Sequence, residues 1–346
     1  MNTIRQIKAY ACVNQNLEER MSSSSGGIFS LLAKSILSRK GSVYGVTMTE
    51  NLKTAEYIRI IDKSKLYKLN GSKYLQAHVG KIFLEVKKDL EEGRFVLFSG
   101  TACHINGLIS FLGKKFVNLY CVDVVCHGTP SPALWKQYVN YIVDQNGGNL
   151  VDINFRCKDK KWAKFEKKEN KRYLFSSMDK DPYMIMFLRD YCLRPSCYTC
   201  IAKTKKHSDI SLADFWGVDK IISNMNDEKG TSLVMIRSEK GINLFNEIKN
   251  QIKLQEVSYS ESIKYNIAEF SSVKKPIERE YFFKDMNTLS FDMLKERYGK
   301  PNPITIKKTL KMIKMKVLNK DTINWSNFGL LFVLNYEKVA DESKSK

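Results

Sequence analysis

The sequence lacks any apolar run long enough to cross a membrane, which takes about 18 residues or more. The longest late run, Phe328 to Leu334, is far shorter. The first ten residues also lack the apolar centre of a secretory signal. We therefore expect a soluble, cytoplasmic protein. Because such a compartment is reducing, the eight cysteines are not expected to form a disulfide framework. They are then either ligands of a metal or cluster or plain buried thiols.

Acidic residues are scarce relative to basic ones. Lys and Arg number 57 and Asp and Glu number 37, which gives a net charge of +20. This excess favours an anionic partner such as nucleic acid, an acidic membrane surface, a phosphorylated cofactor or an acidic protein. The run Lys158 to Arg172 carries eight basic residues, three acids and Trp162. One interpretation is a basic nucleic-acid-binding protein with a structural four-cysteine zinc site; the other is a solvated face.

The pattern of apolar residues predicts an α/β fold. Strand-like and helical segments alternate between Arg94 and Ile142 as β-α-β-α, which favours neighbouring parallel strands. We expect a mixed, largely parallel sheet core with flanking helices, and a C-terminal helical extension. The expected parts are residues 1–93, residues 94–270 and the extension 271–346. Its basic amphipathic stretch, Ile304 to Lys320, fits either core packing or weak association with a membrane surface.

Two cysteines follow strands that are predicted to be parallel. Cys103 lies in a tight loop, Ser99 to Cys103, after the strand Arg94 to Phe98, and Cys126 follows the strand Val117 to Val125. The carboxyl ends of parallel strands share one edge of the sheet, where ligands of open α/β sheets gather. The topology therefore predicts that both cysteines lie at one rim.

A single CxxC pair, Cys197 and Cys200, comes later, and the sequence has no second CxxC. A zinc ribbon needs two such pairs. One pair plus two separate cysteines can instead hold an iron–sulfur cluster, which takes four thiolates. Buried unreactive thiols and structural zinc stay open alternatives. Cys12, Cys121 and Cys157 are weaker candidates, and Cys192 is a possible substitute ligand.

A small polar loop, MSSSSGG from Met21 to Gly27, precedes helical spacing that begins at Ile28. Backbone N–H groups at such a junction can hold a phosphate, and glycine permits its close approach. A plain N-cap serine is the other interpretation.

Seven collinear motifs between Ser22 and Gly241 resemble the coenzyme F-420 hydrogenase/dehydrogenase beta-subunit family. Its members include the beta subunits of F-420-reducing hydrogenase and formate dehydrogenase, and 7-hydroxymethyl chlorophyll a reductase. The motifs are SSSSGGIF (22–29), NGSKY (70–74), LFSGTACHINGL (97–108), DVVCHGTPSP (123–132), INFRCKDKKW (153–162), LRPSCYTC (193–200) and DISLADFWG (209–217).

The resemblance implies an iron–sulfur flavoprotein oxidoreductase that binds a 4Fe–4S cluster and FAD. It implies that the cluster ligands are Cys103, Cys126, Cys197 and Cys200. It assigns the flavin site to two loops and neighbouring positions: Ser24, Ser25, Gly26, Gly27, Gly71, Ser72, Lys73, Tyr74, Gly100, Thr101 and Gly128. As catalytic residues we expect Lys73, which would stabilise an anionic reduced flavin ring, and His127, which would donate a proton. A histidine bonded to a backbone carbonyl is the alternative for His127.

The sequence departs from the family at its N-terminus. Many relatives carry an additional ferredoxin-like segment there, but only Cys12 precedes the Ser/Gly loop in this chain. Electrons would then come from a separate ferredoxin or another acidic electron-transfer protein, which the basic surface would attract. We expect a two-electron organic small molecule as acceptor, either the deazaflavin or, in a bacterium, a substrate of a polysaccharide pathway.

Overall fold

The computed structural model describes residues 7–156, 158, 163–166, 171–174 and 176–301. Cys157, Trp162 and both apolar C-terminal stretches, Ile304 to Lys320 and Phe328 to Leu334, lie outside these residues. The chain divides into two units, Met1–Gly299 and Lys300–Lys346. The three-part division expected from the sequence stays a prediction. Among the described residues, no helix is long and apolar enough to span a membrane.

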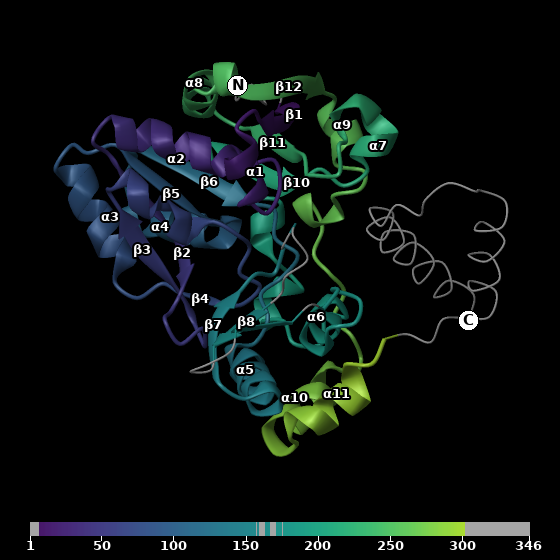
Figure 1. The fold of residues 1–346 in the computed structure, drawn as a ribbon. Coiled ribbons are helices and arrows are strands. Elements are labelled where there is room, and N and C mark those ends of the chain that lie inside the picture. The colour runs from purple at the N-terminus through teal and green to yellow at the C-terminus, as the bar shows by residue number, and fades with distance from the viewer. Residues whose placement is uncertain (1–6, 157, 159–162, 167–170, 175, 302–346) are drawn as a thin grey trace, which may run out of the picture. The chain divides into compact units, whose positions relative to one another are not determined.

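Within the described residues, a nine-stranded sheet forms the centre of the first unit (Figure 1). Its order is β12-β1-β11-β10-β6-β5-β2-β3-β4. The strands are β1 (Lys8–Asn14), β2 (Ser42–Met48), β3 (Ala55–Ile60), β4 (Ala77–His78), β5 (Val96–Thr101), β6 (Leu119–Val124), β10 (Ile210–Asp214), β11 (Ser232–Ile236) and β12 (Ile252–Val257). A smaller antiparallel sheet contains β7 (Asn149–Ile153), β8 (Ala163–Glu166) and β9 (Lys171–Leu174).

The middle of the large sheet is parallel, as the sequence predicts. β2, β5, β6 and β10 pair in parallel, whereas β1, β11 and β12 pair antiparallel on one side. The expected mixed, largely parallel α/β core is thus confirmed. The segment Ser99 to Cys103 differs from the expected loop: β5 extends to Thr101, because that residue still pairs with Val124, and Cys103 lies in the first turn of a helix.

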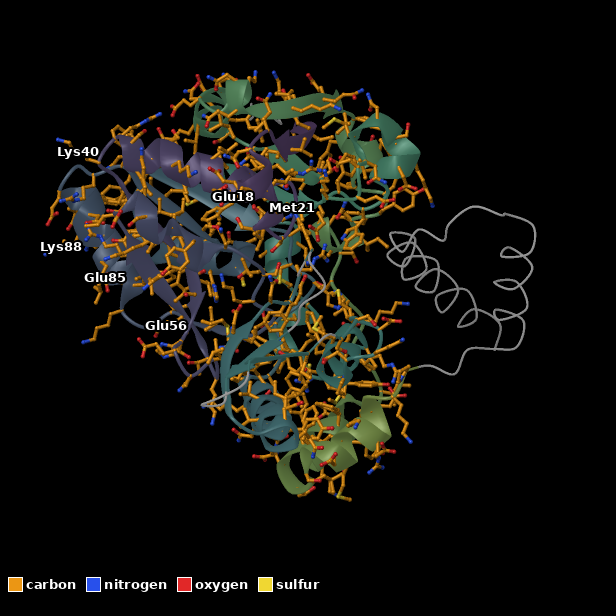
Figure 2. The ribbon with its side chains drawn as sticks, in the orientation of Figure 1. Glu18, Met21, Lys40, Glu56, Glu85 and Lys88 are labelled. Atoms are coloured by element: carbon orange, nitrogen blue, oxygen red, sulfur yellow. The ribbon has the colours of Figure 1, made fainter. Side chains whose placement is uncertain are left out.

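Helices cover both faces of the sheet (Figure 1). They are α1 (Leu17–Met21), α2 (Ile28–Ser38), α3 (Ile82–Glu91), α4 (Ala102–Leu112), α5 (Pro132–Asn146), α6 (Pro182–Leu188), α7 (Val218–Ile221), α8 (Glu239–Asn246), α9 (Tyr259–Ser262), α10 (Arg279–Thr288) and α11 (Phe291–Tyr298). Short 3₁₀ segments are η1 (Lys63–Leu69), η2 (Pro195–Cys197), η3 (Ile201–Lys203), η4 (Ser223–Met225), η5 (Lys249–Gln251) and η6 (Ile267–Glu269). Charged side chains such as Glu85 and Lys88 of α3 project outward (Figure 2).

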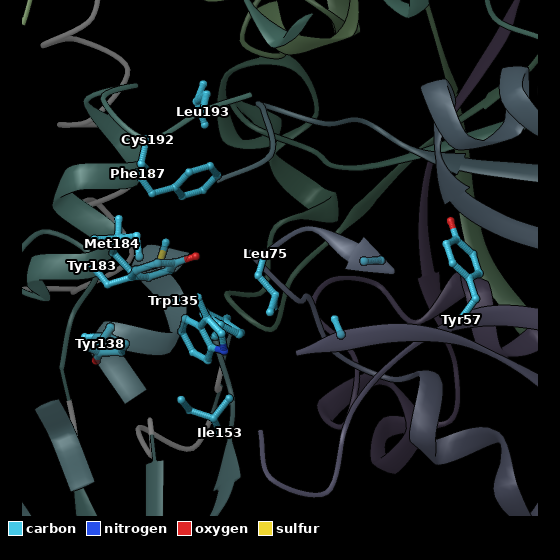
Figure 3. Close-up of a cluster of buried hydrophobic side chains, with 14 of the residues drawn as sticks. Tyr57, Leu75, Trp135, Tyr138, Ile153, Tyr183, Met184, Phe187, Cys192 and Leu193 are labelled. Atoms are coloured by element: carbon cyan, nitrogen blue, oxygen red, sulfur yellow. The ribbon is translucent and has the colours of Figure 1, made fainter. Parts of the chain in front are cut away.

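The sheet separates two main apolar cores. On one face α2 and α8 bury their apolar side chains against β2, β5, β6 and β10. On the other face α3 and α4 pack on the sheet, and the same core continues into α5, α6, α10 and α11. The rings of Trp135, Tyr138 and Tyr183 pack together at the centre of that extension (Figure 3), with centroids 4.9–5.6 Å apart. Such packing fixes the segments that border the rim of the parallel strands.

The junction between α2 and β2 requires a glycine because the backbones approach closely. A Cβ atom on Gly41 would lie 2.5 Å from the Phe95 carbonyl oxygen and 2.8 Å from that of Ile36. We expect Gly41→Ala to lower the free energy of unfolding by about 1–3 kcal/mol, because backbone must move. Urea denaturation measures this change.

Gly107→Ala is the matched control. Gly107 is exposed inside α4, and its Cβ would meet Phe83 at 3.6 Å, an ordinary contact. Alanine there should raise stability by roughly 0.5–1 kcal/mol through helix propensity. An unchanged stability of Gly41→Ala would contradict the close approach.

Candidate functional site

Four cysteines from separate segments line one pocket at the carboxyl ends of β5 and β6. Cys103 comes from the first turn of α4, Cys126 follows β6, and Cys197 and Cys200 belong to a hairpin around η2. His127, Gly128 and Thr101 line the same pocket. The structure therefore brings together the four thiols that the sequence singled out.

The hairpin is held against the loop after β6 by main-chain and side-chain contacts. Arg194 N–H donates to the Thr129 carbonyl at 2.9 Å, and Thr129 N–H donates to Cys197 Sγ at 3.4 Å. The Lys203 ammonium donates to the Cys126 carbonyl and to the Ala268 carbonyl. These bonds fix the spacing between Cys126 and the CxxC pair without using a side-chain sulfur as a donor.

The electrostatics of the pocket favour a bound cation. The pKa of Cys126 is raised to about 12, chiefly by burial; Lys203 acts to lower it, and Cys103, Cys197 and Cys200 act to raise it. Burial and the neighbouring thiols likewise raise the pKa of Cys197. The four groups thus lie close enough for their thiolates to repel one another, and a metal ion would remove that penalty. Among the described residues, no three Cys, His, Asp or Glu side chains already stand at metal-ligating separations.

The other cysteines of the described chain lie elsewhere. Cys12, Cys121 and Cys192 are fully or almost fully buried and do not line the pocket. Burial raises the pKa of each, that of Cys192 to about 12. Figure 3 shows Cys192 beside Phe187 and Leu193 in the apolar core. Cys157 lies outside the described residues.

His127 is oriented by a carboxylate. Its Nε2 lies 2.6 Å from Asp190 Oδ1, and the Phe187 ring packs edge-on against its imidazole at 5.3 Å between centroids. Asp190 has a left-handed backbone (φ 63°) at the end of α6, and Tyr198 donates to its carbonyl at 2.5 Å. The partner is thus a side-chain carboxylate rather than a backbone carbonyl. This arrangement supports an imidazole that holds a proton on one nitrogen.

The two loops assigned to the flavin meet in the structure. Ser72 Oγ donates to Ser24 Oγ at 2.9 Å, and Asn70 Nδ2 donates to Ser22 Oγ at 3.3 Å. Gly71 has a left-handed backbone (φ 79°) with no atom near its Cβ position. Ser24 and Ser72 are 48 positions apart in the sequence, and this hydrogen bond joins their two loops into one polar surface.

Within the Ser/Gly loop the residues have different surroundings. Gly26 packs against β1 and β11, since its Cβ would lie 2.4 Å from the Cys12 carbonyl oxygen, and its N–H already donates to Ser232 Oγ. Ser25 Oγ donates to the Thr231 carbonyl. Gly27 is the left-handed N-cap of α2, and no side chain caps that helix. The N-cap serine considered above is therefore not present, and first-turn N–H groups of α2 stay uncapped.

Cations and aromatic rings surround this surface. Lys73 Nζ donates to the Asn70 carbonyl at 2.7 Å, and burial lowers the Lys73 pKa to about 7. The ring of Tyr74 contacts Phe155 and Phe187, at 5.4 and 5.5 Å between centroids. Because Phe187 also contacts His127, one ring connects the serine loops to the thiol pocket.

The structure adds cations whose position the sequence did not reveal. Lys158 Nζ donates to the carbonyls of Arg20 and Ser25, both at 2.6 Å, and burial lowers its pKa to about 8. Arg156 forms an ion pair with Asp214 at 2.7 Å. In the sequence, the only sign of these two cations was the family-like motif INFRCKDKKW (153–162), which contains both. Within it, Lys158 turns onto the Ser/Gly loop and Arg156 pairs with β10, whereas most of the run Lys158 to Arg172 lies outside the described residues.

Two predicted glycines are explained by packing. A Cβ on Gly100 would lie 2.0 Å from the Tyr57 hydroxyl oxygen, and one on Gly128 would lie 2.6 Å from Leu193 Cδ1. Thr101 Oγ1 lies 3.1 Å from Cys103 Sγ. These positions shape the pocket rim, and their contact with a flavin stays a prediction.

Comparison with known proteins found one family model that is similar to the middle of the chain. The family model that describes the C terminus of the coenzyme F420 hydrogenase/dehydrogenase beta subunit matches residues 93–262. This segment contains all four pocket cysteines, whereas the Ser/Gly loop and Lys73 precede it. None of the curated proteins matches the chain.

Among solved structures, one chain of the F420-reducing nickel–iron hydrogenase complex from Methanosarcina barkeri, studied by xenon derivatization, is similar in fold. Its TM-score is 0.51 at 13% sequence identity, and the match covers 88% of this chain and 98% of that chain. Residues 93–262 thus match the coenzyme F420 hydrogenase/dehydrogenase beta-subunit family, and the chain shares its fold with this hydrogenase chain.

Proposed function

We propose that this protein is an iron–sulfur flavoprotein oxidoreductase. In this proposal the thiol pocket holds a 4Fe–4S cluster and the joined serine loops hold FAD. The chain passes electrons from a ferredoxin-like protein to a two-electron organic acceptor, which is a deazaflavin or another small molecule. An oxidoreductase agrees with the hydrogenase/dehydrogenase family that residues 93–262 match. FAD and the cluster supply one- and two-electron chemistry that side chains lack.

The observation that carries the proposal is the convergence of four thiols from three segments on one pocket. Four thiolates are the ligand set of such a cluster. Cys103 is the exposed member, and Cys126, Cys197 and Cys200 are partly buried. The donor set therefore fits the group, and Cys103 is the thiol nearest to solvent and to a protein partner.

The serine loops fit a flavin nucleotide for three reasons. The uncapped first turn of α2 can donate to phosphate. Lys158 and Lys73 supply positive charge beside the loop. Tyr74 offers an aromatic ring on the side that leads to Phe187. In this arrangement Lys73 stabilises negative charge on the bound ring, and His127, held by Asp190, donates a proton at its imidazole nitrogen.

Replacing any of Cys103, Cys126, Cys197 or Cys200 with serine should abolish the cluster, because three thiolates and a hydroxyl hold it poorly. We expect about four irons per chain in the wild type and loss of most iron and visible absorbance in each variant. Iron, zinc and flavin analysis after anaerobic purification and reconstitution measures the outcome.

Cys121→Ser serves as the control, because this thiol is buried on β6 outside the pocket. Cys157→Ser is expected to keep the cluster too. If all these variants lose iron equally, the ligand assignment is wrong. Stoichiometric zinc in the reconstituted wild type would instead support a structural zinc site.

FAD affinity should fall as pH rises through neutrality. The pKa of free Lys73 is about 7, so the anionic ligand binds best where this amine is protonated, and binding raises that pKa. Lys73→Met should weaken binding roughly 10- to 150-fold at the lower pH, since a charged hydrogen bond contributes about 1.5–3 kcal/mol. Flavin fluorescence titrations from below to above neutral pH provide the measurement.

Lys68→Met is the matched control, because Lys68 is exposed on the adjoining η1 and contacts the site only through its carbonyl. It should retain the pH dependence. If FAD affinity of Lys73→Met depends on pH in the same way as that of the wild type, Lys73 does not face the ligand.

An acidic ferredoxin should reduce the protein at a rate that falls with ionic strength, because a net charge of +20 attracts it over long range. Lys205→Glu should slow this step at low salt, since Lys205 is exposed beside α4, where Asn106 bonds to its carbonyl. Lys88→Glu on α3, whose side chain projects outward and does not line the pocket, is the control (Figure 2). Stopped-flow kinetics at several salt concentrations measure both; equal effects would argue against docking near Cys103.

A further inference from the structure

A buried carboxyl group lines the thiol pocket, and one of its oxygens makes no hydrogen bond of ordinary geometry. Asp123 lies near the end of β6, three residues before Cys126, with no exposed surface. Its Oδ1 accepts a hydrogen bond from Ser211 Oγ. Its Oδ2 is buried and has no partner at hydrogen-bond distance, and the nearby Ser208 hydroxyl, which acts on the same carboxyl, also lacks one. A buried carboxylate oxygen without a partner is costly, and protonation removes most of that cost.

The residues around Asp123 form a buried ionic cluster that the proposed function does not use. Arg237 Nε donates to Ser211 Oγ at 2.6 Å, and the Arg237 guanidinium pairs with Glu269. Lys206 pairs with Glu269 Oε2 at 2.5 Å and also lines the pocket. Hydrogen bonds therefore connect Asp123 through Ser211 to two cations and one anion, all shielded from solvent.

The charged and titratable groups that face Asp123 come from several elements. Lys206 after Cys200, Arg237 after β11 and Cys121 on β6 interact with it electrostatically. Glu269 of η6 pairs with both cations. Lys203, Cys103, Cys126, His127, Cys197 and Cys200 line the same pocket. Burial raises the pKa of Asp123, while the hydroxyls of Ser208 and Ser211 and the cations Lys206 and Arg237 act in the opposite direction. Charge added to the pocket would act on the same carboxyl.

Resting on the proposed function, we propose that Asp123 is a proton-holding site in the wall of the thiol pocket that is coupled to its redox state. When one electron from a low-potential donor enters the metal group, one proton from a hydronium ion forms an O–H bond at Oδ2 and leaves water. When the electron departs, the O–H bond breaks and the proton returns to solvent. The carboxyl thereby keeps the net charge of the buried pocket constant.

Lys206 and Arg237 are less suited than Asp123 to take up and release this proton. Arg237 keeps its proton at all accessible pH values. Lys206 is tied to the Glu269 carboxylate and to the Glu269 carbonyl, the latter at 2.7 Å. Both cations instead offset the negative charge that four thiolates bring into the pocket. Asp123 lines the pocket with a carboxyl oxygen, Oδ2, that has no partner at hydrogen-bond distance.

The first test is a redox titration of reconstituted protein at a series of pH values. Within a window of pH, the potential of wild-type protein should fall by up to about 59 mV for each tenfold decrease in proton concentration, as one proton accompanies one electron. Asp123→Asn should flatten this slope. Asparagine keeps the carbonyl that accepts from Ser211 but cannot take up a proton. An unchanged slope in this variant would overturn the proposal, and so would a flat slope in the wild type.

Asp181→Asn is the matched control. Asp181 is another buried aspartate whose pKa is raised by burial, to about 6, but it caps α6 and bonds to Tyr138 away from the pocket. This variant should keep the wild-type slope. Loss of the slope in both variants would show that it reflects general destabilisation and would count against Asp123.

The second test uses metal-free protein, so that it does not depend on the cluster. Infrared difference spectra between wild type and Asp123→Asn are recorded at a pH above the ordinary carboxyl pKa. They should show a band of a protonated carboxyl group in the wild type, and this band should shift on deuterium exchange. Its absence would overturn the proposal. If the wild type binds no iron, the proposed function fails, while this band still decides whether Asp123 holds the proton.

Discussion

The parallel pairing of β5 with β6 is the constraint on which the site depends. Six consecutive residue pairs, from Val96 with Leu119 to Thr101 with Val124, hold the two strands in one register. The chain after each strand must therefore emerge at the same edge, and each exit carries a cysteine. The hairpin with Cys197 and Cys200 needs only to be fastened to this edge, which the contacts of Thr129 and Lys203 achieve.

The basic character of the chain has an interior counterpart. Lys73 and Lys158 bond to the carbonyls of the serine loops, and Lys203 and Lys206 bond to carbonyls beside the thiol pocket. Each ammonium is thereby partly desolvated near a place that would receive an anionic group. A bound anion restores the favourable environment that burial removed. This arrangement explains why positive charge is retained inside the protein, and it makes nucleic acid unnecessary as an explanation of those residues.

The sequence predicted the parallel core and the candidate thiols because both follow local patterns. Apolar strands, a helix after each strand and cysteines at strand ends are visible within about thirty residues. Asp190, Lys158 and Asp123 were not recognised, because their partners lie far away in the chain: His127 is 63 residues from Asp190, and Ser25 is 133 residues from Lys158. Ser211 lies 88 residues from Asp123. Periodicity carries no information on such pairs, and only the tertiary fold shows them.

Phe187 relates the two halves of the proposed site. Its ring contacts His127 beside Cys126 on one side and Tyr74 beside Lys73 on the other. Phe187 is almost completely buried in α6, whose N-cap Asp181 bonds to Tyr138 of α5 at 2.6 Å. The rigid helical layer thus sets the relation between the loop that follows β6 and the loop that precedes β4. A shift of α6 would move both at once, so that the thiol pocket and the serine loops are positioned as one unit rather than as two independent sites.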